Sequence, residues 1–333
     1  MPRLVLLLAA VATLALVALG CGREDDAEDA DAANAPAAEA TTGEAAAELS
    51  GEVISDGSST VGPLTTAAAE RFREVQPGVN VEVGISGTGG GFERFCAGET
   101  DVSNASRPID EEDEVPLCEE NGIEFTELQV AVDALTVVVN PANDWADCLT
   151  VEELSTIWAP ESEGEVTSWS QVRDGFPDVE LALAGAGTDS GTFDYFTDAI
   201  NGEEGASRSD YTASEDDNTT VQAVEGAEGG LGYFGLSYFL ENEDALKALE
   251  IENEAGECVP PSPETAQAGD YNPLARPLFV YVKNESLERP EVQAFLRFYL
   301  ENVDEIATDA LFIPPPEDVT AASRSALEAA IES

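Results

Sequence analysis

The segment TDSGT, residues 188–192, places hydroxyl groups, a glycine and one carboxylate at a predicted turn from a strand into a helix. The apolar run VELALAGAG precedes this turn, and the helix-like run FDYFTDAIN follows it. A helix start has unpaired backbone N–H groups and a partial positive charge, and serine or threonine adds a hydroxyl donor. Such a turn favours an anion, so the carboxylate of Asp189 needs a separate explanation.

Three further segments have the same order of strand, donor-rich loop and helix. GEVIS leads into DGSSTVGP, where Pro63 suits the first turn of a helix. VNVEVGI leads into SGTGGG, and TDVSNA leads into SRPI. In open α/β folds, such loops gather beyond the carboxyl ends of the strands, where ligands bind. Helix capping explains a single loop of this kind, but four in one chain predict an anion held by neutral donors.

The charge of the chain is consistent with this prediction and argues against other partners. The 333 residues include 68 acidic and 14 basic side chains, which gives a formal net charge of −54. A field this negative repels anions at long range, so binding has to depend on donors in direct contact. The sequence has no basic patch for nucleic acid. So many negative charges repel one another, and molar salt, with a Debye length of about 3 Å, would screen this repulsion. The charge therefore favours a salt-adapted organism. An ordinary acidic surface is the alternative.

The residue types give little support to catalytic chemistry. The sequence contains no histidine, which excludes a Ser-His-Asp triad and histidine-ligated metals. It also lacks the GxxxxGK[ST] phosphate loop, and a nucleophilic serine in DSGT would have no recognisable base. We therefore predict no enzyme activity, no catalytic residues, no cofactor and no metal, with a phosphatase as the enzyme alternative.

Residues 1–20 are typical of a secretion signal. Arg3 supplies the positive charge, and the apolar run 4–19 is too short and too early for a membrane span. The run ends in ALGC, which resembles a bacterial lipoprotein cleavage site and would make Cys21 the lipidated N-terminus; secretion without lipid is the alternative. Residues 21–50 have almost no large apolar side chain, so we expect an acidic tether.

Four long motifs resemble those of the PstS family, the periplasmic phosphate-binding proteins of Pst-type ABC importers. They are DGSSTVGPLTTAAAERF, GISGTGGGFERFCAGETDVSNASRPI, GTDSGTFDYF and GGLGYFGLSYF, and they occur in the family's order. The resemblance runs from about residue 51 to the C-terminus and includes RPEVQAFLRFYLEN. It implies an α/β protein with the type II periplasmic-binding-protein fold, in which two α/β lobes are joined by two crossing strands and bind the ligand in their cleft.

Applied to this chain, the resemblance gives lobe one as residues 51–130 and 274–333 and lobe two as residues 131–273. The crossing strands would be QVAVDALTVVVN and RPLFVYVKN, two apolar, β-rich runs in a chain that otherwise alternates strands and helices. Within lobe two, TVEEL from Thr150 has the capping-box pattern and predicts a helix start.

The remaining four cysteines form no CxxC pair, which argues against a zinc or thioredoxin-like site. An exported chain favours disulfides, and four cysteines allow three pairings. The lobe boundaries implied by the resemblance favour the two pairings that stay within one lobe, Cys96–Cys118 and Cys148–Cys258.

The function implied by the resemblance is that of an extracytoplasmic solute-binding protein. It would capture inorganic phosphate and deliver it to an ABC permease with its ATPase subunit. It would act as a monomer held by a lipid anchor at the bacterial cell membrane, in the periplasm or at the outer face. The alternatives are a binding protein for sulfate, molybdate or tungstate, and a surface phosphate sensor or adhesive protein without a transport role.

The family's binding residues can be carried over to three motifs, each supplying hydroxyl or backbone N–H donors. The motif DGSST supplies Ser59 and Thr60. The motif SGTGGG supplies Ser86, Thr88 and Gly89. The motif DSGT supplies Ser190, Gly191 and Thr192.

Two charged positions depart from the family pattern. The family has an aspartate in the loop corresponding to NASRPI and an arginine just before the Ser-Gly-Thr turn, whereas this chain has Arg107 and Asp189 there. We hypothesise that cation and carboxylate have exchanged lobes. Arg107 would fork onto two phosphate oxygens, and Asp189 would accept the proton that sulfate lacks at neutral pH. In the alternative, Asp189 caps its helix and Arg107 pairs with the DEEDE run. Asp56 and Asp101 are rival carboxylates for the role of proton acceptor assigned to Asp189.

Overall fold

The computed structural model describes residues 49–188 and 190–333. The predicted signal peptide, the lipidation site Cys21, nearly all of the tether and Asp189 lie outside the described residues. In the described part of the chain, no helix combines the length and the apolar character that crossing a bilayer requires.

A mixed sheet organises the described residues, with nine strands in the order β2-β1-β3-β12-β4-β8-β6-β7 and with β9 paired to β4. The strands are β1 (Gly51–Gly57), β2 (Val79–Val83), β3 (Val102–Ala105), β4 (Phe125–Val139), β6 (Ala182–Ala186), β7 (Thr212–Ser214), β8 (Gly230–Gly235), β9 (Lys247–Ala248) and β12 (Ala275–Lys283).

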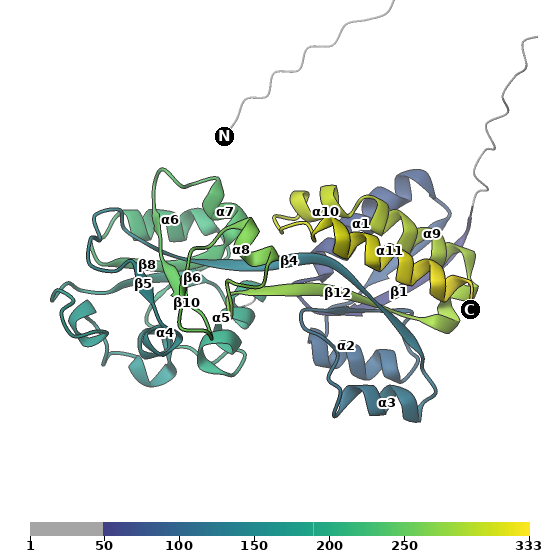
Figure 1. Ribbon diagram of the computed structural model, residues 1–333, viewed down its shortest axis with the longest axis horizontal. Helices are drawn as coiled ribbons and strands as arrows, with labels where there is room; N and C mark the ends of the chain where they lie inside the picture. The colour runs from purple at the N-terminus through teal and green to yellow at the C-terminus, as the bar shows by residue number, and fades with distance from the viewer. Residues whose placement is uncertain (1–48, 189) are drawn as a thin grey trace, which may run out of the picture. The chain divides into compact units, whose positions relative to one another are not determined.

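Strands β4 and β12 connect the two parts of this sheet. They pair antiparallel from Ala275 opposite Ala134 to Lys283 opposite Phe125. β12 also pairs with β3, and β4 continues to pair with β8, so both strands run from one part into the other (Figure 1). The two apolar runs expected to be crossing strands fall on β4 and β12, and this expectation is confirmed.

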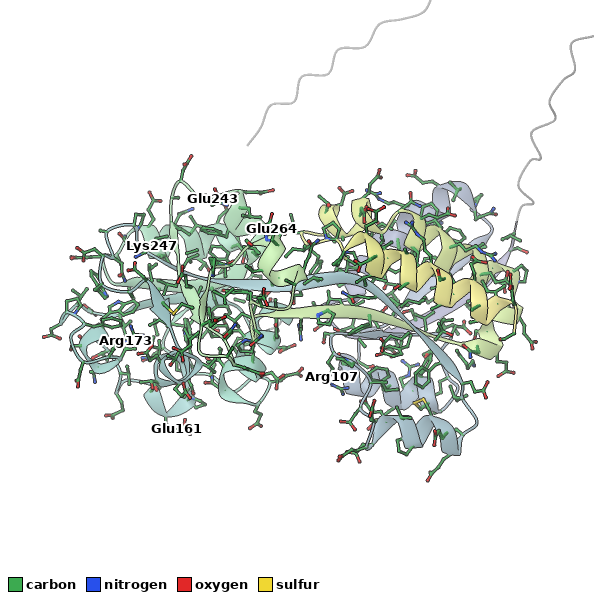
Figure 2. The ribbon with its side chains drawn as sticks, in the orientation of Figure 1. Arg107, Glu161, Arg173, Glu243, Lys247 and Glu264 are labelled. Carbon is green, nitrogen blue, oxygen red and sulfur yellow. A yellow bond between two sulfur atoms is a disulfide. The ribbon has the colours of Figure 1, made fainter. Side chains whose placement is uncertain are left out.

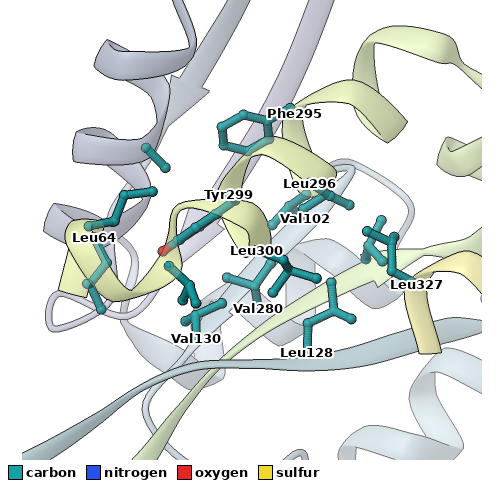
Figure 3. Packing of buried hydrophobic residues seen from close by; sticks show 14 of the residues in the cluster. Leu64, Val102, Leu128, Val130, Val280, Phe295, Leu296, Tyr299, Leu300 and Leu327 are labelled. Carbon is teal, nitrogen blue, oxygen red and sulfur yellow. The ribbon is translucent and has the colours of Figure 1, made fainter. Parts of the chain in front are cut away.

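In predicted lobe one, helices cover both faces of the sheet (Figure 1). On one face, α1 (Gly62–Val75), α9 (Pro290–Glu301), α10 (Val303–Asp309) and α11 (Glu317–Ile331) pack on the strands. Their core includes Val280, Phe295 and Tyr299 (Figure 3). On the other face, α2 (Gly87–Cys96) and α3 (Glu114–Glu120) bury Phe92 and Tyr281.

Predicted lobe two has the same layered arrangement. Helices α4 (Val151–Trp158) and α5 (Gly191–Asn201) pack on one face around Trp158, Phe196 and Tyr233. The opposite face carries α6 (Asp217–Glu225), α7 (Leu236–Leu240) and α8 (Pro263–Gln267). A small second sheet contains β5 (Cys148–Leu149), β10 (Glu250–Glu252) and β11 (Cys258–Val259). Three short 3₁₀ turns among the described residues are Pro160–Ser162, Trp169–Gln171 and Asn284–Glu288.

Several local predictions are confirmed. Thr150 begins α4 with a complete capping box: its hydroxyl accepts from the Glu153 backbone N–H, and the Glu153 carboxylate accepts from the Thr150 N–H. Pro63 lies in the first turn of α1, where its missing N–H costs nothing. The expected disulfides are both present, Cys96–Cys118 between α2 and α3 and Cys148–Cys258 in the small sheet.

Candidate functional site

In the loop after β1, backbone N–H groups hold the hydroxyl of Ser58 in place. Ser58 is buried, and its Oγ accepts from the backbone N–H of Thr60 at 3.2 Å and of Val61 at 3.4 Å. Gly57 is required just before it, because φ is +138° and a Cβ would lie 2.2 Å from the Asn104 carbonyl oxygen. The loop therefore enters α1 with its position fixed by neighbouring strand β3.

The turn before α5 lies directly against this loop. A Cβ added at Gly191 would be 2.7 Å from Thr60 Oγ1 and 3.3 Å from Ser59 Oγ. Only glycine permits such an approach between the starts of α1 and α5. Residues about 130 positions apart in the sequence are thus brought together, as the four donor loops predicted.

A small cavity lies between these two turns. Its lining consists of hydroxyl side chains, one glycine, two carboxylates and one arginine: Ser58, Ser59, Thr60, Gly87, Thr88, Ser106, Asp194, Glu204 and Arg276. Of the residues predicted from the sequence, Ser59, Thr60 and Thr88 line it. The uncharged donors come from the loops after β1, β2 and β3, which meet at the carboxyl ends of these strands, where α/β folds bind ligands.

The loop after β2 contributes two different kinds of residue. Thr88 Oγ1 lies 2.9 Å from Ser106 Oγ and also accepts from the Ser106 backbone N–H at 3.3 Å. The predicted Gly89 lies outside the cavity lining, and a Cβ there would meet no heavy atom of the described residues within 4 Å. Ser86 lies outside the cavity lining and donates its hydroxyl to Asp56 Oδ1 at 2.8 Å.

Asp56 holds its own loops together. Its carboxylate also accepts from the Gly57 N–H at 2.7 Å and pairs with Arg94. Asp101 likewise accepts from the Ile54 N–H at 3.0 Å and from the Ser286 hydroxyl at 2.7 Å. Both rival carboxylates therefore hold their own loops together, and neither lines the cavity.

The predicted binding residues of α5 are placed beside the cavity. Ser190 is the N-cap, and its Oγ accepts from the Thr192 backbone N–H at 3.1 Å. Neither residue lines the cavity, and Gly191 reaches it only through its contact with Ser59 and Thr60. Asp189 lies outside the described residues.

Arg107 forms the ion pair that the sequence left open as an alternative. Its Nη1 donates to Glu114 Oε2 at 2.8 Å and its Nη2 to Glu114 Oε1 at 2.7 Å. Glu114 is the last residue of the DEEDE run, and the Arg107 side chain is 46% exposed. Figure 2 labels Arg107 on predicted lobe one. Arg107 does not line the cavity. The binding role predicted for it would require release from Glu114.

The cation of the cavity is Arg276, which none of the sequence motifs indicated. Arg276 lies on β12; its Nε donates to Asp133 Oδ2 at 3.3 Å, and its Nη2 donates to Thr60 Oγ1 at 3.1 Å. Its guanidinium carbon lies 3.6 Å from the centre of the Tyr195 ring. Burial raises the pKa of the Asp133 carboxyl, and Arg276 offsets part of that rise. An arginine at the start of the predicted crossing strand RPLFVYVKN was the signal that could have revealed it.

Two carboxylates of predicted lobe two complete the lining. Removal from water raises the pKa of Asp194, while Arg276 and the Ser59 hydroxyl lower it in part. Glu204 lies at the rim with an exposed side chain, and desolvation together with repulsion from Asp194 and Asp198 raises its pKa. The site therefore combines neutral donors and one arginine with negative groups on the opposite side.

A metal site has little support in the described residues. One group with ligand spacing is present, Cys148, Glu250 and Cys258, with its ligand atoms within 4.8 Å of one another. The two sulfurs are joined in a disulfide and cannot act as thiolate ligands.

Comparisons with known proteins agree with the motifs and the fold. The model of the PBP superfamily domain matches residues 37–303. The protein SphX of Synechococcus elongatus is 48% identical over 273 residues, 82% of this chain and 80% of SphX. The phosphate-binding protein PstS of Staphylococcus saprophyticus is 38% identical over 268 residues, 80% of this chain and 81% of that protein.

Solved structures give the same result. A possible phosphate binding protein from Planctomyces limnophilus has a TM-score of 0.81 and 49% identity, and the match covers 85% of this chain and 99% of that one. An ABC-type phosphate transport receptor from Vibrio cholerae has a TM-score of 0.64 and 21% identity, and the match covers 80% of this chain and 100% of that one. At this low identity, the likeness supports the fold alone. The chain has the type II periplasmic-binding-protein fold and belongs to the PBP superfamily and, within it, to the family of PstS phosphate-binding proteins.

Proposed function

We propose that this protein captures inorganic phosphate outside the cytoplasm and delivers it to an ABC-type importer. The observation that carries the proposal is the cavity in which hydroxyl donors from three loops face an arginine. Relatives that are named as phosphate-binding proteins support the choice of anion.

The donor set suits a tetrahedral oxyanion. The hydroxyls of Ser59, Thr60 and Thr88 can donate to separate oxygens, and the open space at Gly87, which lines the same cavity, allows a ligand to approach. Gly191 and the start of α5 would close over the anion from the other side, with helix N–H groups directed at it. In a chain with a net charge of −54, such short-range donors compensate for an unfavourable long-range field.

We further propose that the protein works by closure of two lobes, residues 51–130 with 274–333 and residues 131–273. Strands β4 and β12 would be the hinge. A ligand that contacts both lobes favours the closed state because its affinity for that state is higher. No covalent bond is made or broken in this function, so we infer that the protein is not an enzyme.

The surroundings of the protein are part of the proposal. A lipid on Cys21 and the acidic segment 21–50 would tether a monomer to the outer face of the cell membrane. The permease and ATPase subunits of the importer would be its partners.

Recognition of a protonated anion remains a proposal based on the sequence. Asp189 would accept the phosphate proton, so that sulfate would leave a buried carboxylate unpaired and would be rejected. The matching role of Arg107 would require its release from Glu114, with which it is paired.

Calorimetric titration of the purified protein in high salt tests the function. We expect a saturable one-to-one exotherm with phosphate and much weaker binding of sulfate and molybdate. Equal or tighter binding of either competitor would make another oxyanion the ligand. Absence of any anion binding would reject the proposal.

A further inference from the structure

We propose that Arg276 is the cation that binds the captured anion and holds the two lobes closed around it. This inference rests on the proposed function and deepens it, because it assigns the charged contact of the site to a hinge strand. It differs from the exchange hypothesis, which assigned that contact to Arg107.

Arg276 contacts every part of the molecule that closure has to bring together. It lies on hinge strand β12 and pairs with Asp133 on hinge strand β4. Its Nη2 donates to Thr60 at the start of α1 in lobe one, and its guanidinium lies over the Tyr195 ring of α5 in lobe two. One side chain therefore joins both strands and both lobes.

The orientation of the guanidinium leaves donors for an anion. Asp133 accepts from Nε, at one edge of the planar group. Arg276 lines the cavity, and at its other edge, the Nη edge, the described residues take one hydrogen bond, from Nη2 to the uncharged hydroxyl of Thr60. A guanidinium can donate two parallel bonds to an oxyanion, so this edge suits a phosphate oxygen pair.

The environment strengthens such a contact. The Arg276 side chain is 15% exposed and that of Asp133 is 8% exposed, so both charges lie where water screens them weakly. Asp133 keeps the buried cation compensated in the absence of ligand. The carboxylates of Asp194 and Glu204 are both attracted to the charge of Arg276. An arriving anion would take over this attraction by forming a direct hydrogen bond with the guanidinium.

The contacts of Arg276 also explain why anion binding would favour closure. Thr60 and Tyr195 come from different lobes, and both touch the guanidinium at the same time only when those lobes are together. An anion bound to the Nη edge would then contact donors of both lobes through Arg276. Its affinity for the closed state would exceed that for the open state.

The test compares two double variants of the full chain by calorimetric titration with phosphate. Arg276→Gln with Asp133→Asn removes the cation without leaving a buried charge unpaired. The matched control is Arg173→Gln with Glu153→Gln, since Arg173 also pairs with a carboxylate and lies over an aromatic ring, Phe176.

We expect the first double variant to lose phosphate affinity by about 30-fold or more, as for truncation of a buried charge-assisted contact. The control should stay within about threefold of wild type. Arg276→Lys, which keeps the charge for Asp133, should retain part of the affinity and serves as the decisive variant if the double variant does not fold.

Each outcome decides the proposal. Wild-type phosphate affinity in the Arg276 double variant, with only its unfolding temperature lowered, would show a structural role and overturn the inference while leaving the proposed function intact. Unchanged affinity in Arg276→Lys would overturn the two-bond geometry. If the wild-type protein binds no phosphate, the proposed function fails, and the inference fails with it.

Discussion

Two arginines, Arg107 and Arg276, show how differently the same side chain is used in this protein. Arg107 is 46% exposed and is paired through two bonds with Glu114, seven residues further along the chain. Arg276 is 15% exposed and meets Asp133 and Thr60, which are 143 and 216 residues away in sequence. A departure from the family motif pointed to the first, whereas the fold places the second in the cavity. A place beside a sequence motif therefore does not by itself bring a side chain into the cavity.

The ion pairs Arg276–Asp133 and Arg107–Glu114 should differ most in their contribution to the free energy of unfolding. Asp133→Leu leaves the Arg276 cation buried without its partner, and we expect the free energy of unfolding to fall by about 3–5 kcal/mol. Urea denaturation of the variant and of the wild-type protein, at the same high salt concentration, measures this loss of unfolding free energy. A loss below about 1 kcal/mol would mean that water reaches Arg276 and that the two arginines are alike.

A second test addresses the closeness of the turns around Arg276. Gly191→Ala places a Cβ 2.7 Å from Thr60 Oγ1, the atom to which Arg276 donates. Overpacking of this kind costs about 1–3 kcal/mol, so we expect phosphate affinity to fall roughly tenfold. Gly235→Ala is the control, because a Cβ there meets no heavy atom of the described chain within 4 Å. Equal affinities in the two variants would show that the turns need not meet.

The pH dependence of binding should come from the carboxylates near Arg276. The pKa values of Asp194 and Glu204 are raised, chiefly by desolvation, so both groups take up protons at a higher pH than ordinary carboxyls. As pH falls from 7 to 4, which is near the ordinary carboxyl pKa values and below the raised ones, their negative charge decreases and repels the anion less. Phosphate affinity should therefore rise by up to about fivefold more in wild type than in Asp194→Asn with Glu204→Gln.

The titration of phosphate itself is common to both proteins, so the ratio of affinities at the two pH values isolates the contribution of the carboxylates. The two proteins should be compared in the same buffers by calorimetry. Equal ratios in wild type and variant would contradict the assignment of these side chains to the cavity.

The smallest effect is expected at Arg107. Glu114→Gln weakens a half-exposed ion pair, which should lower the free energy of unfolding by less than about 1 kcal/mol. Phosphate affinity should change by less than about twofold, since Arg276 already supplies the cation. A clear gain in affinity would instead favour the exchange hypothesis, because it would show that a released Arg107 binds the anion.

The sequence predicted the elements of the fold well, because their signals are local. Pro63 at the start of α1 and the capping box at Thr150 each act within one helical turn. The crossing strands were recognisable as apolar runs rich in β-branched residues. The strand–loop–helix units likewise carry their glycines and hydroxyls at fixed positions.

The charged part of the site could not be predicted in the same way. The pairing of Arg276 with Asp133 depends on the antiparallel register of β12 and β4, which places these two residues opposite each other. Asp194 belongs to the cavity only because α5 begins against the β1–α1 loop. No local pattern encodes either contact. The motifs therefore indicated uncharged residues of the cavity such as Thr60 and Thr88 but not Arg276, which lines the same cavity.

A crystal structure of the protein with phosphate tests the central claim most directly. We predict phosphate oxygens within about 3 Å of the Arg276 guanidinium and of the Thr88 hydroxyl, with Arg107 still paired to Glu114. Phosphate held by Arg107, with Arg276 bound only to Asp133 and Thr60, would contradict it.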